Sequence, residues 1–85
     1  MTFQELERKI GKQVEADWTQ HGNGWGWVHK SAIVDKCAFI GERAIVFSGR
    51  VSGDARVYGD ARVYGDARVY GNARVHSNWL SLQND

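Results

Sequence analysis

A six-residue repeat is the sequence feature that most constrains how this chain can fold. The motif is clearest at residues 57–62, which read Val-Tyr-Gly-Asp-Ala-Arg, and neighbouring copies begin at Val51, Val63 and Val69. A weaker copy precedes it, with Val28, Val34, Ile40 and Val46 in the valine position and Ala32, Ala38, Ala44 and Gly49 in the small position. A fixed period of this kind is typical of solenoids, and it predicts one across residues 27–78.

Each hexad has the pattern of one short β-strand followed by a corner. Ala and Val alternate with Arg and Tyr, which places the small apolar residues on one side of a strand. Gly and Asp then tolerate the sharp change of direction at a corner. Three such sides would close one coil of eighteen residues, and strands of successive coils would stack about 4.8 Å apart. Because Val51 follows Val46 by five positions instead of six, one corner is predicted to be tighter by a residue.

These hexads resemble the hexapeptide-repeat proteins, and the run of Gly-Asp-Ala-Arg-Val-Tyr copies is most similar to small bacterial and phage or prophage repeat proteins. The resemblance covers residues 27–78. It implies a mainly β fold, a left-handed parallel β-helix of between two and three coils, usually assembled as a trimer. Enzymes of the family include acyltransferases and zinc-dependent γ-class carbonic anhydrases.

The chain is expected to form one domain, with other elements at the two ends of the solenoid. Thr2 and Glu5 have the spacing of a capping box, which predicts a helix over residues 2–17. Residues 18–26, rich in glycine, are expected to be a loop, and residues 79–85 a cap over the last coil. The expected packing face of the helix contains Phe3, Leu6, Ile10, Val14 and Trp18.

Folding the hexads around a triangle assigns the outward residues to three faces. The first contains Trp27, His29, Ile45, Phe47, Arg62 and Tyr64. The second contains Ile33, Asp35, Arg50, Ser52, Arg68 and Tyr70; the third contains Phe39, Gly41, Arg56, Tyr58, Arg74 and His76. The first carries four large apolar or aromatic groups in its lower coils, so we expect it to be covered, by the N-terminal helix, by another subunit, or by both. It is the predicted subunit interface.

The arginines of the repeat recur at strict spacing but belong to different faces, with acidic residues at neighbouring corners. This distribution lacks the one-sided basic stripe of a nucleic-acid binder. A nucleotide or sugar phosphate is a different matter, because a few Arg and Tyr side chains at an interface suffice to hold it. We therefore consider Arg62 and Tyr64 as residues that could bind a small anionic ligand.

No catalytic or metal-binding constellation is evident, and no cofactor is predicted. His29 and His76 map to different faces and His21 lies before the first repeat, so three zinc ligands do not converge. No hexad carries the long insertion expected of an acyltransferase. Cys37 occupies a corner position without a neighbouring base and is expected to be a turn residue.

Composition limits the remaining choices. The 85 residues carry a net charge of +1, one cysteine and no apolar run long enough for a membrane span, which favours a reducing, cytoplasmic location. The first hypothesis is a non-catalytic structural or protein-interaction module that acts as a homo-oligomer, with a trimer as the implied state. The alternatives are a small-anion binding or sequestering protein and an acyltransferase-like or hydratase-like enzyme.

Overall fold

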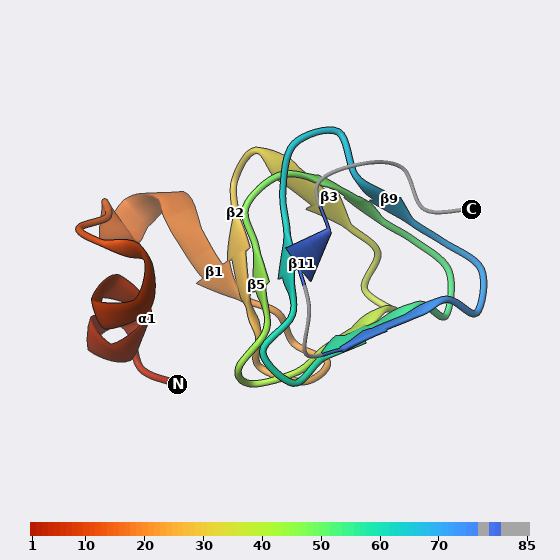
Figure 1. The fold of residues 1–85 in the computed structure, drawn as a ribbon, viewed down its shortest axis with the longest axis horizontal. Coiled ribbons are helices and arrows are strands. Elements are labelled where there is room, and N and C mark those ends of the chain that lie inside the picture. Colours follow the sequence, from red (N-terminus) through yellow and green to blue (C-terminus); the bar gives the residue numbers. More distant parts are fainter. Residues whose placement is uncertain (77–78, 81–85) are drawn as a thin grey trace.

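The computed structural model describes residues 1–76 and the backbone of residues 79–80. Parallel strands stack into three sheets that form the sides of a triangular prism, and the helix α1 lies beside one of these sides (Figure 1). The prediction of a mainly β chain with stacked parallel strands is therefore confirmed. Within the described residues, no helix has the length and apolar composition that crossing a bilayer requires.

The first side of the prism is a five-stranded sheet, and the other two sides have three strands each. In spatial order the first contains β1 (Trp18–Gln20), β2 (Trp27–His29), β5 (Ile45–Val46), β8 (Arg62–Val63) and β11 (Trp79–Leu80). The second contains β3 (Ala32–Val34), β6 (Gly49–Val51) and β9 (Arg68–Val69). The third contains β4 (Phe39–Ile40), β7 (Arg56–Tyr58) and β10 (Arg74–His76).

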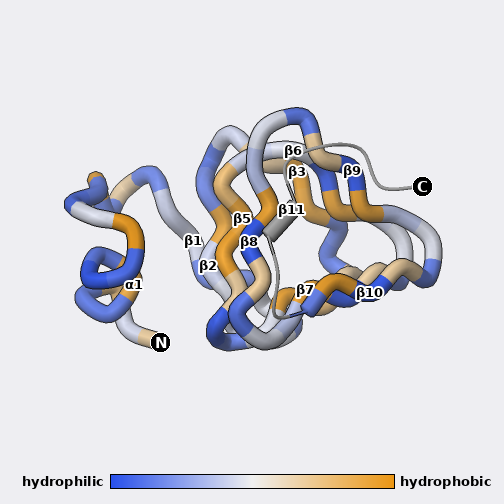
Figure 2. The backbone as a smooth tube through the Cα atoms, in the orientation of Figure 1, coloured by the Kyte–Doolittle hydropathy of each residue, from blue (hydrophilic) through white to orange (hydrophobic). Residues whose placement is uncertain are grey.

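The inward valines and alanines of the hexads form one continuous core. Val46, Val57 and Val63 are fully buried, as are Ala55 and the other alanines from residue 38 to residue 67. Hydrophobic segments recur on each side of the prism where the strands lie, and the corners between them are hydrophilic (Figure 2). The two-residue alternation thus accounts for the core, because each strand turns its small apolar residues toward the axis.

The tight corner predicted between Val46 and Val51 is visible in the pairing of the strands. Trp27 pairs with Ile45, eighteen residues further on, whereas Ile33 pairs with Arg50, only seventeen residues further on. Gly49 lies in this corner with φ at +92°, and a Cβ atom added there would lie 2.5 Å from the carbonyl oxygen of Ala67. Only glycine fits such a backbone without rearrangement.

The N-terminal helix is shorter than the predicted span of residues 2–17. Helix α1 covers Phe3–Ile10, and Gly11 ends it with φ at +89° while its N–H donates to the carbonyl of Glu7 at 2.8 Å. The expected capping box is present: the Thr2 hydroxyl accepts from the Glu5 N–H, and the Glu5 carboxylate accepts from the Thr2 N–H. The hydrogen bond from the Thr2 backbone holds the pKa of Glu5 below its ordinary value of 4.5.

Two further boundaries differ from the sequence-based expectation. Residues 18–26 are not entirely loop, because β1 pairs antiparallel with β2 and extends the first sheet. At the other end, the backbone of β11 pairs in parallel with β8, so the solenoid ladder continues beyond residue 78. Leu80 follows Val75 by five residues, the same spacing as at the tight corner, which explains how the tail keeps the register. The expected packing of the Trp79, Leu80 and Leu82 side chains over the last coil lies outside the described residues.

Candidate functional site

The outward side of β2 and β5 is covered by the N-terminal segment of the same chain, and we call this side of the prism, which β8 continues, the covered face. Ile45 is 1% exposed and Trp27 is 7% exposed, and both belong to a cluster with Leu6 and Trp18. Trp27 also donates its indole N–H to the carbonyl of Met1 at 2.9 Å. The helix and β1 thus occupy the area that was predicted to meet either the helix or another subunit.

The remaining residues predicted for this interface lie at the border of the covered area. The ring of Trp18 packs edge-on against His29 at 4.9 Å and against Phe47 at 5.7 Å between ring centres. Phe47 in turn contacts the ring of Tyr64 at 6.4 Å. Arg62 lies above Ile45 in the strand register. Arg62 and Tyr64, our first candidates for a ligand site, are partly buried beside these rings.

The predicted packing face of the helix requires one correction. Phe3, Leu6 and Ile10 pack in the cluster, and Trp18 reaches it from β1 rather than from the helix. Val14 is 62% exposed. It lies beyond Gly11, where the helical period no longer applies, so the apolar spacing that placed it on the same stripe has no structural meaning there.

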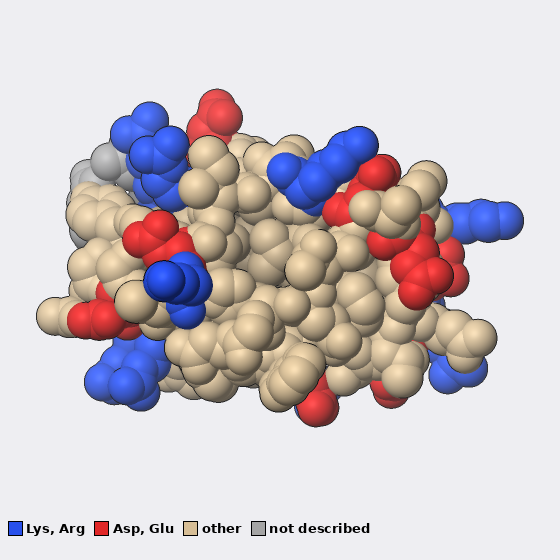
Figure 3. Space-filling model, turned by 180° about the vertical axis from the view of Figure 1, so that it is seen from behind, with Lys and Arg blue, Asp and Glu red and all other residues tan. Residues whose placement is uncertain are grey.

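Arginines of the repeat are divided among the three sheets, as the triangular arrangement predicts. Arg62 lies in β8, Arg50 and Arg68 lie in β6 and β9, and Arg56 and Arg74 lie in β7 and β10. From behind, basic and acidic side chains alternate around a broad uncharged centre (Figure 3). This view shows no continuous basic stripe of the kind that tracks a nucleic-acid backbone.

The histidines make three separate sets of contacts. His21 bonds to the carbonyl of Ala38 at 2.8 Å, His29 to the Ser31 hydroxyl at 2.9 Å, and His76 stacks on Tyr58. In the described part of the chain, no three His, Cys, Asp or Glu side chains form a cluster that could hold a metal ion. Cys37 is exposed at a corner.

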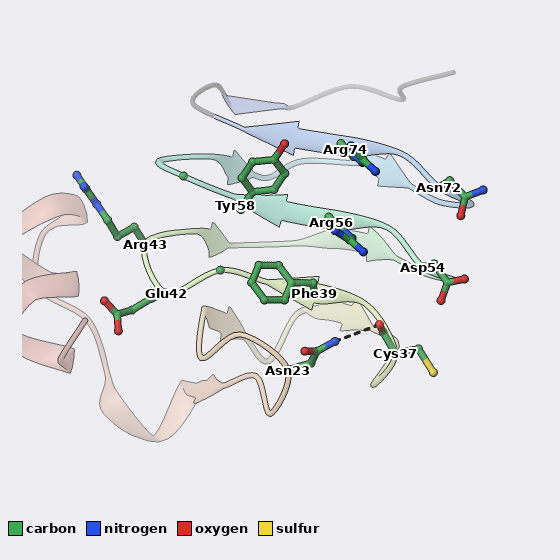
Figure 4. A pocket seen from close by; sticks show the side chains of 12 residues that line it. Asn23, Cys37, Phe39, Glu42, Arg43, Asp54, Arg56, Tyr58, Asn72 and Arg74 are labelled. Atoms are coloured by element: carbon green, nitrogen blue, oxygen red, sulfur yellow. Dashed lines mark hydrogen bonds between the residues drawn. The ribbon is translucent and has the colours of Figure 1, made fainter.

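An open groove of about 950 Å³ lies on the third side of the prism, and we call this side the open face. The outward side chains of β4, β7 and β10 form its floor, and the corners before and after these strands form its rims (Figure 4). Its floor includes Phe39, Arg56, Tyr58 and Arg74. The sequence placed these residues on one face but did not single them out as a site.

Two side-chain columns run up the open face. Phe39, Arg56 and Arg74 occupy equivalent positions in neighbouring strands, so the two guanidinium groups lie on adjacent rungs. Beside them, Tyr58 stacks on His76, with ring centres 5.2 Å apart and planes at 19°. Gly41 lies beneath Tyr58, and a Cβ there would be 3.0 Å from the Tyr58 Cβ and 3.4 Å from the Phe39 ring. The glycine therefore lets the Phe39 ring extend under Tyr58.

A sequence signal for this groove does exist. Gly41 occupies the outward position that Tyr fills in the regular repeats, and Phe39 fills the position of Arg. With Phe39 in place of an arginine, the open face has an aromatic ring in its lowest strand and the pair Arg56 and Arg74 in the two strands above. Reading it requires the strand register, because these residues are far apart along the chain.

Comparison with known proteins agrees with the architecture. Three overlapping segments, residues 49–65, 55–68 and 61–77, match the family model described as YdcK Beta solenoid repeat. Comparisons with curated proteins and with solved structures gave no match. The matched segments cover the regular hexads, and the strand pairing extends the same architecture on either side of them. The chain therefore has a β-solenoid architecture, in which residues 49–77 are similar to that repeat.

Proposed function

We propose that this protein is a non-catalytic scaffold: a left-handed, hexapeptide-type β-helix that assembles with copies of itself and presents rigid arrays of side chains to a protein partner. The observation that carries this proposal is the side formed by β3, β6 and β9, which no described segment of the chain covers. Its outermost strand, β3, pairs with β6 only, and Ile33 at its centre is 56% exposed. Tyr70, after β9, is 47% exposed on the same side.

The bottom edges of the other two sheets are occupied by the chain itself. Strand β1 pairs with β2, and the loop before β2 bonds to β4 through Gly26 N–H to Ile40 O at 2.8 Å and Ile40 N–H to Asn23 O at 3.0 Å. In the described residues, nothing pairs with β3 from that direction. An exposed edge strand with an apolar side chain is a site where another chain can add. A second copy of this chain is the occupant we propose, with a trimer as the expected state.

The test is the mass in solution at micromolar concentration. Light scattering of the full chain should report an oligomer, and Ile33→Lys should shift it to the monomer because a charge would be forced into the contact. Val14→Lys is the matched control, since Val14 is similarly exposed, at 62% against 56%, but lies outside the solenoid. A monomeric parent protein would overturn the assembly proposal.

A further inference from the structure

The open face presents two arginines whose charges no described side chain neutralises. Arg56 and Arg74 face each other directly across neighbouring strands, about 4.8 Å apart at the backbone. Like charges directly opposite one another in a sheet are destabilising. Within residues 1–76, the ion pairs made by arginine involve Arg43, whose guanidinium lies 2.9 Å from Asp60, and neither member of the stacked pair takes part.

Aromatic surface lies immediately beside these charges. Figure 4 shows Phe39 and Tyr58 on one side of the groove and Arg56 and Arg74 on the other. The rings are held by their neighbours, Tyr58 by stacking on His76 and Phe39 by the space that Gly41 leaves. A flat ring can stack on such a surface, and guanidinium groups bind phosphate oxygens in a bidentate manner.

Acidic residues mark the two ends of the groove and limit what can enter it. Glu42 lies at the rim near Arg43, and Asp54 lies at the opposite corner, before β7 (Figure 4). A long polyanion running across the face would pass both carboxylates. A ligand with one compact anionic group, bound between them, would not.

We propose that the open face binds a small ligand that combines one phosphate-like group with an aromatic ring, of the class of nucleoside monophosphates. The phosphate lies between Arg56 and Arg74, and the ring packs on Phe39 and Tyr58. This site differs from the position beside Arg62 and Tyr64 considered from the sequence, where rings of the N-terminal segment occupy the adjacent surface.

The repeat supplies a matched control on the adjoining side of the prism. Arg50 and Arg68 form the same stacked pair there, in register between β6 and β9. In strand register, Ile33 lies where the open face has Phe39, and Ser52 lies where it has Tyr58, so these two positions carry no aromatic ring. The two faces therefore share the arginine pair and differ in the rings.

Isothermal titration calorimetry of the full chain with AMP tests the proposal, with adenosine and inorganic phosphate as the two partial probes. We expect AMP to bind with a Kd of roughly 0.1–1 mM, as a shallow site with a small contact area allows. Arg56→Gln/Arg74→Gln should weaken binding by about tenfold or more, and Arg50→Gln/Arg68→Gln by less than about twofold. Tyr58→Leu should also weaken it, whereas Tyr70→Leu should not.

Three results would overturn the inference. One is no measurable binding of AMP up to about 10 mM. Another is equal loss in the two double arginine variants, which would indicate general electrostatic attraction. The third is that adenosine or inorganic phosphate binds as tightly as AMP, which would show that either the arginines or the aromatic rings do not contribute to binding. If the double variant does not fold, Arg74→Gln alone, checked by its melting curve, gives the same comparison.

Discussion

The covered face and the open face are built from the same hexads, yet the N-terminal segment covers one, while the described residues leave an open groove on the other. In the lowest coils, the position that carries Arg in the regular repeats carries Ile45 on the covered face and Phe39 on the open face. Ile45 is 1% exposed, and Phe39 is partly exposed in the groove. The backbone pattern therefore fixes which way a residue points, and the residue chosen there decides whether the face attracts the chain's own N-terminal segment.

The largest effect is expected when the arginine of the regular repeat is placed at position 45 on the covered face. Ile45→Arg would place an unpaired guanidinium beneath Leu6 and Trp18, and we expect it to lower the free energy of unfolding by about 4 kcal/mol. The control is Val14→Arg, an exposed apolar position outside the solenoid, with an expected change within about 0.5 kcal/mol. Urea denaturation followed by tryptophan fluorescence measures both. Similar midpoints for the two variants would show that the N-terminal segment does not seal the covered face.

A cavity under the helix should have a smaller effect. Leu6 has no exposed surface, so Leu6→Ala removes buried methyl groups and should destabilise the protein by about 3 kcal/mol. Val14→Ala removes exposed methyl groups and should change stability by less than about 0.5 kcal/mol. Thermal unfolding of the two variants separates a packed helix face from an unpacked extension. A loss of stability in Val14→Ala as large as in Leu6→Ala would show that Val14 packs with the helix face, as the sequence predicts.

The corner between the covered sheet and the second side can be tested at Gly49. Gly49→Ala combines a left-handed backbone with a clash against the Ala67 carbonyl, and we expect a loss of about 2 kcal/mol. Gly71→Ala has the left-handed backbone, φ +66°, but no atom within 4 Å of the added Cβ, and should cost about 1 kcal/mol. Denaturant midpoints would rank the two. The reverse order would mean that the tight corner relaxes easily.

The smallest expected effect concerns the helix that covers one face. Thr2→Ala removes the cap of α1 and should destabilise the helix by about 1 kcal/mol.

The acid side of the same capping box can be tested at Glu5. The hydrogen bond from Thr2 N–H lowers the pKa of Glu5, so the stabilising contribution of this carboxylate is complete above pH 4.5 and is lost as the pH falls through the pKa of Glu5 in the folded protein. Glu5→Gln should therefore flatten a small acid-induced decrease in the melting temperature. An identical acid profile for Glu5→Gln and the parent protein would contradict this.

Much of this arrangement follows from arithmetic on the sequence. The two-residue alternation and six-residue period place Trp27, Ile45 and Arg62 on one sheet, and the five-residue spacing after Val46 predicts the tight corner. The predicted helix of residues 2–17 is too long because Gly11 takes a positive φ and ends the helix, and the apolar spacing does not reveal this. Strand β1 was missed because its three residues carry no period of their own and pair only because the edge of β2 is available. The open groove depends on how the Phe39 ring crosses Gly41, a contact that periodicity does not encode.

The five-residue corner also determines how the coils align, because the regular hexads alone would allow several alignments with nearly the same core packing. Residues 55–70 repeat Ala-Arg-Val-Tyr without change, so sliding these coils by one hexad would match valine to valine and alanine to alanine again. Such a slide would bring an alanine into the place of Gly49, where its Cβ would lie against a backbone carbonyl of the neighbouring strand, and would break the shorter pairing distance that follows. The irregular lower coils thus specify the alignment of regular coils that could not specify it themselves.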